Sequence, residues 1–268
     1  MDSKKAMISP FDSGFLYGDG VYDTLRTYNG KVWQVDEHLT RLEKSAVRLQ
    51  LKLPYSKAKI AEMIVKLVKK NKFKESRIRV TVTRGINNGF SGCKSPTLFI
   101  HAVPLVAESK NVYERGVAAI TVGYERVAPE AKTTSLLPMV LAHQAMNKKR
   151  VFEAIYVDSK GFVREGTITN IAIIKDDTLY TPKNDILAGT TRTLIIKLAR
   201  NIGLKTKIVD FKVDQLYKAD EVLISNAPRK IIPVRKIDKT VIGKGRPGPY
   251  TKQLMKNFDE YVEKNNIG

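Results

Sequence analysis

The side chains that suggest chemistry in this chain are an amine and a carboxylate, Lys132 and Glu165. Lys132 precedes an apolar run, and Glu165 lies in a polar turn rich in Gly, Thr and Asn. An amine can form a Schiff base with a carbonyl compound, and a carboxylate can keep a ring nitrogen protonated. The chain contains 47 Lys and Arg residues, however, and most lysines in such a sequence are solvated surface charges. The spacing of the two residues therefore does not assign them a role by itself.

The segments around these two residues resemble the paired lysine and E-G-x-x-x-N blocks of the class IV (fold type IV) pyridoxal-phosphate aminotransferases. They are residues 132–137 (KTTSLL) and residues 165–171 (EGTITNI), and further blocks match in order over nearly the whole chain. The resemblance implies that Lys132 is the catalytic lysine, which forms a Schiff base with pyridoxal 5'-phosphate. It also implies that Glu165 binds the ring nitrogen of this cofactor.

A third block resembles the segment that supplies an arginine to the cofactor phosphate in this family. Residues 37–42 (EHLTRL) fit the pattern E-H-x-x-R-L at each position, and its arginine is Arg41 here. A guanidinium suits this role because it is always charged and offers two parallel N–H donors to phosphate oxygens. Without the resemblance, Arg41 would be interpreted as a surface charge.

Two more blocks complete the implied phosphate site. Residues 187–192 (LAGTTR) resemble the L-x-G-(I/V)-T-R block, and this implies Thr190 and Thr191 as phosphate ligands. Free backbone N–H groups at the start of a helix suit an anion. Relatives often carry a hydroxyl group at the position of Ala227, which lacks one. The backbone N–H groups of Asn226 and Ala227 are therefore expected to bind the phosphate.

The substrate pocket is implied by the opening block. Residues 18–23 (GDGVYD) resemble the family's G-D-G-V-(Y/F)-(D/E) segment, where aromatic residues line the substrate pocket, and this points to Tyr17 and Tyr22. The alternative, in which both are packed core tyrosines, stays open. Arg26 and Arg79 are candidates for binding the substrate carboxylate, on the basis of their charge.

The resemblance is less specific for the member of the family. Branched-chain enzymes commonly have Asn-Tyr where this chain has Ser135-Leu136, and D-amino acid enzymes have an Arg-x-His pair that residues 86–91 (INNGFS) lack. Residues 9–18 (SPFDSGFLYG) and Ser225-Asn226 resemble 4-amino-4-deoxychorismate lyases. We expect an aminotransferase that moves the amino group between a branched-chain-like amino acid and a 2-oxo acid such as 2-oxoglutarate. The lyase and a D-amino acid aminotransferase remain alternatives.

The composition of the chain bears on other classes of function, such as nucleic-acid binding, metal binding and secretion. The formal net charge of +20 keeps a basic nucleic-acid-binding protein on the same fold as the non-enzyme alternative, but the lysines are spread along the chain, which favours a solvated surface. The scattered histidines, His38, His101 and His143, suggest no metal cluster. A single cysteine, Cys93, excludes an intrachain disulfide and fits a reducing cytoplasm. No signal peptide or membrane span is expected, and the resemblance implies a homodimer.

The elements that must position these residues form an α+β protein. Residues 21–28, 78–83 and 97–103 are typical of strands, and Asn29-Gly30 predicts a hairpin turn. Amphipathic helices are predicted from an N-cap at Asp36 and over residues 56–70, so a helix layer covers an antiparallel sheet.

We expect this small N-terminal domain at residues 1–115 and a larger cofactor-binding domain at residues 116–268. The resemblance implies that they are the α/β sandwich and the pseudo-barrel of fold type IV. The helix expected over residues 136–149 should anchor Lys132 by burying Leu137, Val140 and Leu141.

Overall fold

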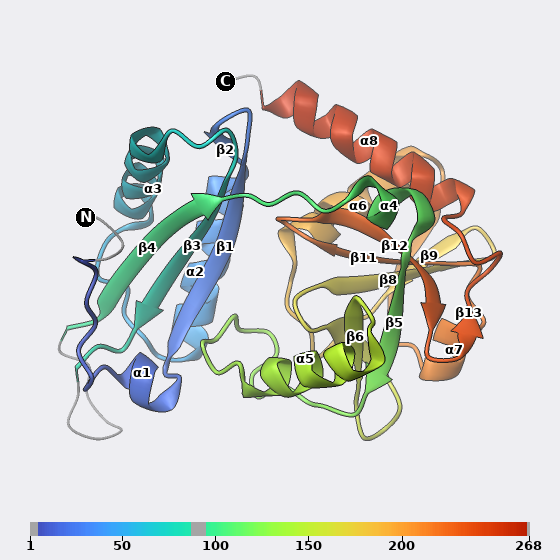
Figure 1. The fold of residues 1–268 in the computed structure, drawn as a ribbon, viewed down its shortest axis with the longest axis horizontal. Coiled ribbons are helices and arrows are strands. Elements are labelled where there is room, and N and C mark those ends of the chain that lie inside the picture. The colour runs from blue at the N-terminus through green and yellow to red at the C-terminus, as the bar shows by residue number, and fades with distance from the viewer. Residues whose placement is uncertain (1–4, 87–94, 267–268) are drawn as a thin grey trace. The chain divides into compact units, whose positions relative to one another are not determined.

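The computed structural model describes residues 5–86 and 95–266, and it divides into two compact units (Figure 1). The first unit comprises Met1–Val106 and Glu130–Leu136, and the second comprises Ala107–Pro129 and Leu137–Gly268. The division thus lies before the junction expected between residues 115 and 116, and the segment with Lys132 belongs to the first unit. The sequence interpretation treated Lys132 as part of the second domain because the two stretches of the first unit are far apart in the chain. Cys93 and most of the loop expected around it lie outside the described residues.

The first unit is built on an antiparallel sheet with the strand order β2-β1-β3-β4. The strands are β1 (Gly20–Tyr28), β2 (Lys31–Val32), β3 (Ser76–Thr83) and β4 (Thr97–Pro104). The predicted hairpin turn is confirmed: Tyr28 pairs with Lys31, and Asn29 and Gly30 have φ values of 51° and 73°. Positive φ at both central residues is the geometry that an Asn-Gly turn favours.

Two helices, α2 (Val35–Arg48) and α3 (Lys57–Asn71), pack on one face of this sheet, and the short helix α1 (Ser13–Tyr17) precedes β1. Their apolar faces form the core with Val21, Leu25, Ile78, Val80 and Val82. Because side chains alternate along a strand, the opposite face of the sheet carries residues of the other parity, namely Tyr22, Arg26, Arg77, Arg79 and His101.

The start of α2 differs from the expectation. Its N-cap is Gln34, which has φ 48° and makes no side-chain capping bond, whereas Asp36 lies inside the first turn. An acidic residue in the first turn still favours the helix through the positive end of the helix dipole. The repeat of apolar residues located the helix, but it did not show whether Asp36 is the N-cap or an acidic residue of the first turn. The helix predicted over residues 56–70 is present as α3, and Ser56 is its N-cap, which accepts from Lys59 N.

The second unit is built on a mixed sheet whose strand order is β10-β9-β8-β11-β12-β5-β6-β7, with β13 paired to β12. The strands are β5 (Val117–Val122), β6 (Glu153–Val157), β7 (Val163–Gly166), β8 (Asn170–Lys175), β9 (Thr178–Thr181), β10 (Lys205–Ile208), β11 (Glu221–Asn226), β12 (Lys230–Ile237) and β13 (Thr240–Val241). The central strands are buried almost along their whole length, which fits their continuous runs of branched apolar residues.

Helices of the second unit are α4 (Lys110–Arg115), α5 (Leu137–Lys149), α6 (Thr190–Asn201), α7 (Val213–Tyr217) and α8 (Pro249–Asn265). The anchoring role expected for α5 is wrong, because Leu137, Val140 and Leu141 are 65%, 46% and 38% exposed. The helix instead buries Ala142 and Met146, which pack in one cluster with residues of β6. Its apolar residues lie on nearly all sides, so the sequence did not single out the buried face.

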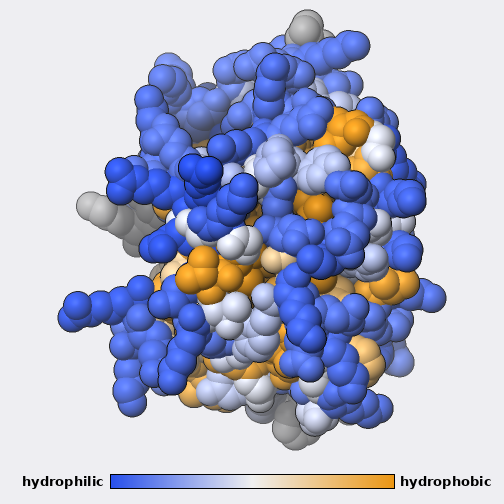
Figure 2. Space-filling model, turned by 90° about the vertical axis from the view of Figure 1, so that its right-hand side faces the viewer, coloured by the Kyte–Doolittle hydropathy of each residue, from blue (hydrophilic) through white to orange (hydrophobic). Residues whose placement is uncertain are grey.

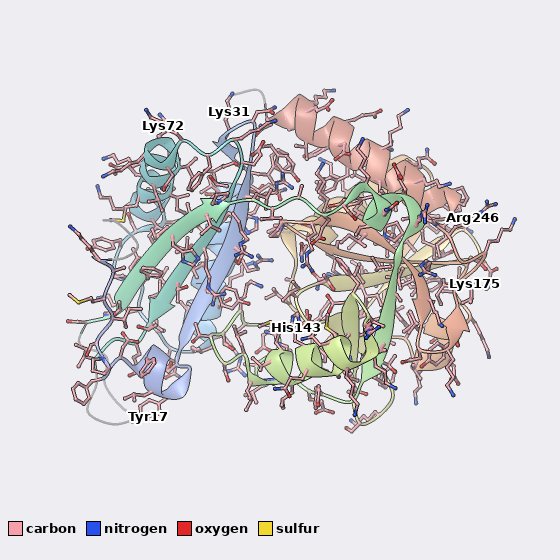
Figure 3. The ribbon with its side chains drawn as sticks, in the orientation of Figure 1. Tyr17, Lys31, Lys72, His143, Lys175 and Arg246 are labelled. Carbon is pink, nitrogen blue, oxygen red and sulfur yellow. The ribbon has the colours of Figure 1, made fainter. Side chains whose placement is uncertain are left out.

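The surface is rich in charge. Exposed cations such as Lys31, Lys72 and Arg246 project from separate parts of the chain (Figure 3). Hydrophilic side chains dominate the face drawn in Figure 2, and hydrophobic ones gather there in small groups. Among the described residues, no helix combines the length and apolar character needed to cross a membrane.

Candidate active site

Lys132 is held by its backbone against β1 and α2. Its carbonyl oxygen accepts a hydrogen bond from Tyr22 N at 2.8 Å, and its N–H donates to Ser45 Oγ at 3.1 Å. The next residue, Thr133, forms a β-bridge with Val21. The position of the lysine backbone is therefore set by the first unit itself, not by the helix that follows.

The side chains of Lys132, Tyr22 and Arg79 lie together. The Lys132 Nζ atom is 4.7 Å from the centroid of the Tyr22 ring, and the Arg79 guanidinium carbon is 3.6 Å from the same centroid. Tyr22 is buried, whereas Lys132 is half-buried. Burial lowers the pKa of Arg79 from its ordinary value, and the Tyr22 hydroxyl partly opposes this effect. Cations above an aromatic ring are stabilised by its negative face, so Tyr22 is a shared platform for two positive groups.

The same sheet face also carries Arg77 and His101, which the sequence interpretation did not place at the site. Arg79 pairs across the sheet with His101, and Arg77 pairs with Arg26 on the other side. Burial lowers the pKa of His101, and the charges of Arg79 and Arg77 lower it further. The alternation of Arg77 and Arg79 along the strand was the available signal, since both residues must lie on one face.

Arg26 and Tyr17 occupy different environments. Arg26 is buried, its Nε donates to Thr27 O at 3.0 Å, and its guanidinium lies 3.9 Å from the Tyr28 ring centroid. Tyr17 ends α1 and is 48% exposed. Tyr17 is thus no core residue in this chain.

Arg41 forms a two-pronged pair with Asp23. Its Nε donates to Asp23 Oδ2 at 2.8 Å and its Nη2 donates to Asp23 Oδ1 at 2.7 Å. Burial by itself raises the pKa of Asp23, but the charges and hydrogen bonds of Arg41 and His38 outweigh this and hold the pKa well below its usual range. The predicted phosphate ligand is therefore fixed in the first unit by a buried carboxylate that stays ionised.

Glu165 is the buried carboxylate of the second unit, with a side chain 6% exposed. Its Oε2 accepts from Leu187 N at 3.0 Å and lies 3.4 Å from Asn170 Nδ2, and its Oε1 accepts from Arg126 Nη1. A buried carboxylate needs such partners, because burial of an unpaired charge is costly. The partner Arg126 was not foreseen, since nothing in the sequence relates it to Glu165.

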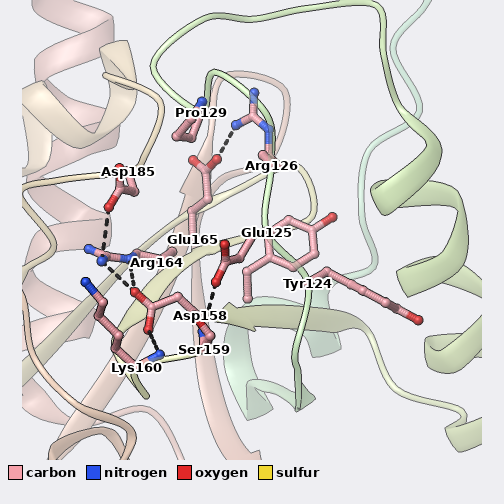
Figure 4. Close-up of a pocket in the computed structure, with 11 residues that line it drawn as sticks. Tyr124, Glu125, Arg126, Pro129, Asp158, Ser159, Lys160, Arg164, Glu165 and Asp185 are labelled. Carbon is pink, nitrogen blue, oxygen red and sulfur yellow. Dashed lines mark hydrogen bonds and ion pairs between the residues drawn. The ribbon is translucent and has the colours of Figure 1, made fainter.

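A pocket of about 250 Å³ opens beside Glu165 in the second unit (Figure 4). It is lined by Tyr124, Glu125, Arg126, Pro129, Tyr156, Asp158, Ser159, Lys160, Arg164, Glu165 and Asp185. Burial raises the pKa of Tyr156 to about 12, and the Tyr156 hydroxyl oxygen has no hydrogen-bond partner among the described residues. Glu165 thus lies at a hollow lined by polar and charged groups.

The turn that follows Glu165 is held by hydrogen bonds to the carboxylate of Glu153, which is fully buried. Its Oε1 accepts from Thr167 N at 3.1 Å and from Thr167 Oγ1 at 2.6 Å, and its Oε2 accepts from Thr169 Oγ1 at 2.9 Å. A Cβ atom at Gly166 would lie 2.1 Å from Thr169 Oγ1 and 2.9 Å from Glu153 Cδ. The turn therefore requires glycine at this position because the side chains approach its backbone closely.

The start of α6 is tied to the same turn. Gly189 is the N-cap, so Thr190 and Thr191 occupy the first turn, where backbone N–H groups lack intrahelical acceptors. A Cβ atom at Gly189 would lie 1.9 Å from Asn170 Oδ1, and Asn170 Nδ2 donates to Leu187 O at 2.8 Å. The Glu165 turn and the helix start are thus joined in the second unit.

Asn226 ends β11 beside the same turn, because the neighbouring Ser225 pairs with Asn170. Asn226 Nδ2 donates to Ile168 O at 3.3 Å, and its Oδ1 accepts from Arg229 N at 2.9 Å. Ala227 follows in the turn between β11 and β12. The structure therefore brings Glu165, Thr190, Thr191, Asn226 and Ala227 to adjoining turns of the second unit, whereas Lys132, Arg41, Tyr22 and Arg79 belong to the first.

The chain belongs to the class IV aminotransferases: this family, described as amino-transferase class IV, matches residues 20–237. The protein is accordingly a pyridoxal-phosphate-dependent aminotransferase with the α+β architecture of fold type IV.

Its relatives carry two activities in their names. A putative branched-chain-amino-acid aminotransferase of Methanocaldococcus jannaschii is 37% identical and covers 97% of this chain and 93% of its own length. A D-alanine aminotransferase of Staphylococcus aureus is 35% identical and covers 98% and 95%.

Solved structures agree in fold. The branched-chain amino acid aminotransferase of Escherichia coli matches with a TM-score of 0.90 at 28% identity, covering 97% of this chain and 91% of that one. The branched-chain amino acid aminotransferase of T.th., solved with pyridoxamine 5'-phosphate, matches with a TM-score of 0.92 at 25% identity, covering 98% and 91%.

Proposed function

We propose that this aminotransferase binds pyridoxal 5'-phosphate through Lys132 and Glu165 and uses Lys132 as its catalytic amine. The observation that carries the proposal is the setting of Lys132. Its backbone is held on both sides by Tyr22 N and Ser45 Oγ, and its Nζ lies 4.7 Å from the Tyr22 ring. No ion pair engages this amine within residues 5–86 and 95–266. A fixed backbone with an uncommitted amine suits a group that must form and release a covalent bond.

The donor set fits the cofactor. The buried Glu165 carboxylate, held by the N–H of Leu187, supplies the acidic partner that a protonated ring nitrogen needs. The guanidinium of Arg41 and the first-turn N–H groups of Thr190 and Thr191 supply positive ends for a phosphate. The turn at Asn226 and Ala227, which adjoins the Glu165 turn, adds backbone donors.

When bound, pyridoxal phosphate supplies an electron sink that stabilises the negative charge developed at the substrate α-carbon. Glu165 would hold the proton on the ring nitrogen, and Arg126 Nη1 donates to the Glu165 carboxylate. Lys132 Nζ would take the proton from the substrate α-carbon and deliver it to the carbonyl carbon of the cofactor. Arg26 and Arg79 bind the substrate carboxylate, and the Tyr22 ring holds Arg79 in place. Tyr17, exposed at the end of α1, is assigned to the outer wall of the substrate pocket.

We infer that the amino donor is a branched-chain-like amino acid and that the acceptor is a 2-oxo acid such as 2-oxoglutarate. This rests on the relative from Methanocaldococcus jannaschii, which is named a putative branched-chain enzyme. A second candidate is D-amino acid transfer, because the Staphylococcus aureus relative of nearly equal identity is named a D-alanine aminotransferase. Relatives of both kinds support amino-group transfer and leave the stereochemistry to experiment.

The test mixes the purified protein, loaded with pyridoxal phosphate, with L-leucine or L-valine plus 2-oxoglutarate, and separately with D-alanine plus 2-oxoglutarate. Glutamate formed from the L-amino acids supports the proposal, and glutamate formed only from D-alanine supports the second candidate. Aminodeoxychorismate is tested as a third substrate. Release of pyruvate and 4-aminobenzoate from it would show lyase activity and would contradict the proposal of amino-group transfer. Borohydride reduction followed by peptide mass spectrometry should locate the cofactor on Lys132.

We also infer that two copies associate. Apolar side chains of α1 and α5 are exposed, including Phe15 at 74%, Leu16 at 46% and Leu137 at 65%. Exposed clusters of large apolar side chains are typical of interaction surfaces. The occupant that we assign to them is a second copy of this chain, because enzymes of this family are expected to be homodimers.

A further inference from the structure

A buried polar network lies beneath the predicted phosphate ligand of the first unit. Asp23, on the helix-facing side of β1, is fully buried, and so is His38 on α2. Asp23 accepts two hydrogen bonds from Arg41, one from His38 Nδ1 at 2.9 Å and one from Thr24 N at 2.7 Å. Both oxygens of this carboxylate are therefore engaged, and the guanidinium faces it in a bidentate arrangement.

The proton positions follow from the chemistry of the pair. The pKa of Asp23 is held well below its usual range, so the carboxylate is ionised near neutral pH and only accepts hydrogen bonds. The hydrogen atom between them must then be on His38 Nδ1, which donates a hydrogen bond to Asp23. The 3.3 Å approach of Arg41 Nη2 to His38 Nδ1 joins two donors and is no hydrogen bond. His38 thus supports Asp23, and Asp23 in turn orients Arg41.

A second link joins the turn with Arg41 to the segment with Lys132. Ser45, which is buried, donates from Oγ to Arg41 O at 2.9 Å and accepts from Lys132 N at 3.1 Å. Tyr22, the neighbour of Asp23, donates from its backbone N to Lys132 O at 2.8 Å. All these contacts lie inside the first unit. The Ser45 hydroxyl group therefore links the backbone of Arg41 to that of Lys132, and strand β1 links the Lys132 backbone to Asp23, the partner of the guanidinium.

We propose that Asp23, His38 and Ser45 are positioning residues that set the separation between the Arg41 guanidinium and the Lys132 amine. The inference rests on the proposed function, in which Arg41 binds the phosphate and Lys132 binds the aldehyde carbon of one rigid molecule. Because the two ends of that molecule have a fixed separation, a preset distance between their protein partners removes part of the cost of ordering them on binding. The alternative is that these residues only satisfy one another in the core.

The test compares pyridoxal phosphate with pyridoxal, which has the aldehyde but lacks the phosphate. Dissociation constants of both are measured for the full chain and for Asp23→Asn, Ser45→Ala and Arg41→Gln. Asp23→Asn is expected to weaken pyridoxal phosphate on the order of tenfold or more, because hydrogen bonds to charged groups contribute at least that factor, and to leave pyridoxal unchanged. Ser45→Ala should act in the same direction. The double variant Asp23→Asn/Arg41→Gln should be no weaker than Arg41→Gln alone, because both changes remove one interaction.

Asp36→Asn is the matched control, since Asp36 is an exposed carboxylate of α2, the helix that carries Arg41, and pairs with Lys57. The inference would be overturned if Asp23→Asn lowered the melting temperature but left the ratio of the two dissociation constants as it is in the unaltered chain. If Asp23→Asn does not fold, His38→Gln and Ser45→Ala carry the comparison, and unchanged ratios in both would overturn it as well.

Failure of the proposed function has a different signature. Borohydride reduction of the unaltered chain with pyridoxal phosphate, read by peptide mass spectrometry, reports whether Lys132 is the attachment site. Attachment elsewhere, or no attachment, would remove the proposed function together with this inference. Attachment at Lys132 with equal phosphate preference in all variants would leave the proposed function standing and remove the positioning role alone.

Discussion

The backbone N–H of Leu187 donates a hydrogen bond to Oε2 of Glu165 at 3.0 Å, although the two residues are 22 positions apart in the chain. This bond ties the carboxylate to the segment that leads into α6, whose first turn is the proposed phosphate site. In the second unit, the group proposed for the ring nitrogen and the group proposed for the phosphate are therefore parts of one hydrogen-bonded arrangement.

Replacement of Glu165 by glutamine should remove the acid–base function and keep the shape. The amide can still accept from Leu187 N, but it cannot hold a ring nitrogen protonated, so we expect kcat to fall about a hundredfold or more. Steady-state kinetics with saturating cofactor measures this. Glu125→Gln is the control, because Glu125 lines the same pocket and accepts a hydrogen bond from Ser159 N. Equal activity of the two variants would contradict the role of Glu165.

Gly189→Ala should displace Asn170. The added Cβ would lie 1.9 Å from Asn170 Oδ1, which is far inside contact distance, so the Asn170–Leu187 bond must break or the helix start must shift. We expect a loss of about 1–3 kcal/mol in the free energy of unfolding and weaker binding of pyridoxal phosphate.

Gly123→Ala provides the matched comparison for this change, since no atom lies within 4 Å of a Cβ at Gly123. Its free energy of unfolding should stay near that of the unaltered chain. Denaturant titration measures both variants. A stable Gly189→Ala protein with unaltered cofactor affinity would show that the close approach at Asn170 has no consequence.

Glu153→Gln should loosen the turn that presents Glu165. The carboxylate accepts from Thr167 N, Thr167 Oγ1 and Thr169 Oγ1, and an amide replaces one accepting oxygen by a donor. We expect a destabilisation of about 1–3 kcal/mol together with a lower kcat. Glu260→Gln, an exposed change on α8, is the control. Destabilisation without any change in kcat would limit Glu153 to a structural role.

The stability contributed by Asp23 should depend on pH. Its folded pKa lies below its unfolded value of about 3.9, so its contribution is fully present above about pH 4 and is lost as the pH falls through the folded pKa. At pH 7, Asp23→Asn should cost about 3–5 kcal/mol, because it leaves the Arg41 charge without its partner. Denaturant titrations at pH 7 and pH 3 should show a smaller difference between the two proteins at pH 3. A larger difference in the free energy of unfolding at pH 3 than at pH 7 would contradict this prediction.

Phe15→Asp should weaken association of two copies. Phe15 is 74% exposed on α1, and a charge placed in a buried apolar interface is costly. Light scattering after size-exclusion chromatography is expected to give a monomer mass for the variant and a dimer mass for the unaltered chain. Val47→Asp, an exposed apolar position on α2, should keep the dimer mass. A monomer mass for the unaltered chain would refute the association itself.

Local patterns were sufficient for most elements of the first unit. The Asn29-Gly30 turn and the alternation of Ile78, Val80 and Val82 depend on neighbouring residues, and the structure has them as expected. The buried face of α5 was not predictable, because its apolar residues surround the helix axis and only tertiary contact, with β5 and β6, selects Ala142 and Met146.

The sequence by itself determined the family, the linear blocks around Lys132, Arg41 and Glu165, and the helices and strands that carry them, because these depend on residue type and short spacing. Only the tertiary structure decided their partners. Arg126 meets Glu165 across 39 positions, Ser45 meets Lys132 across 87, and Asp23 meets Arg41 across 18. Pairings of this kind arise when strands and helices pack around a core, and no local pattern records which distant polar group will be buried beside a given charge.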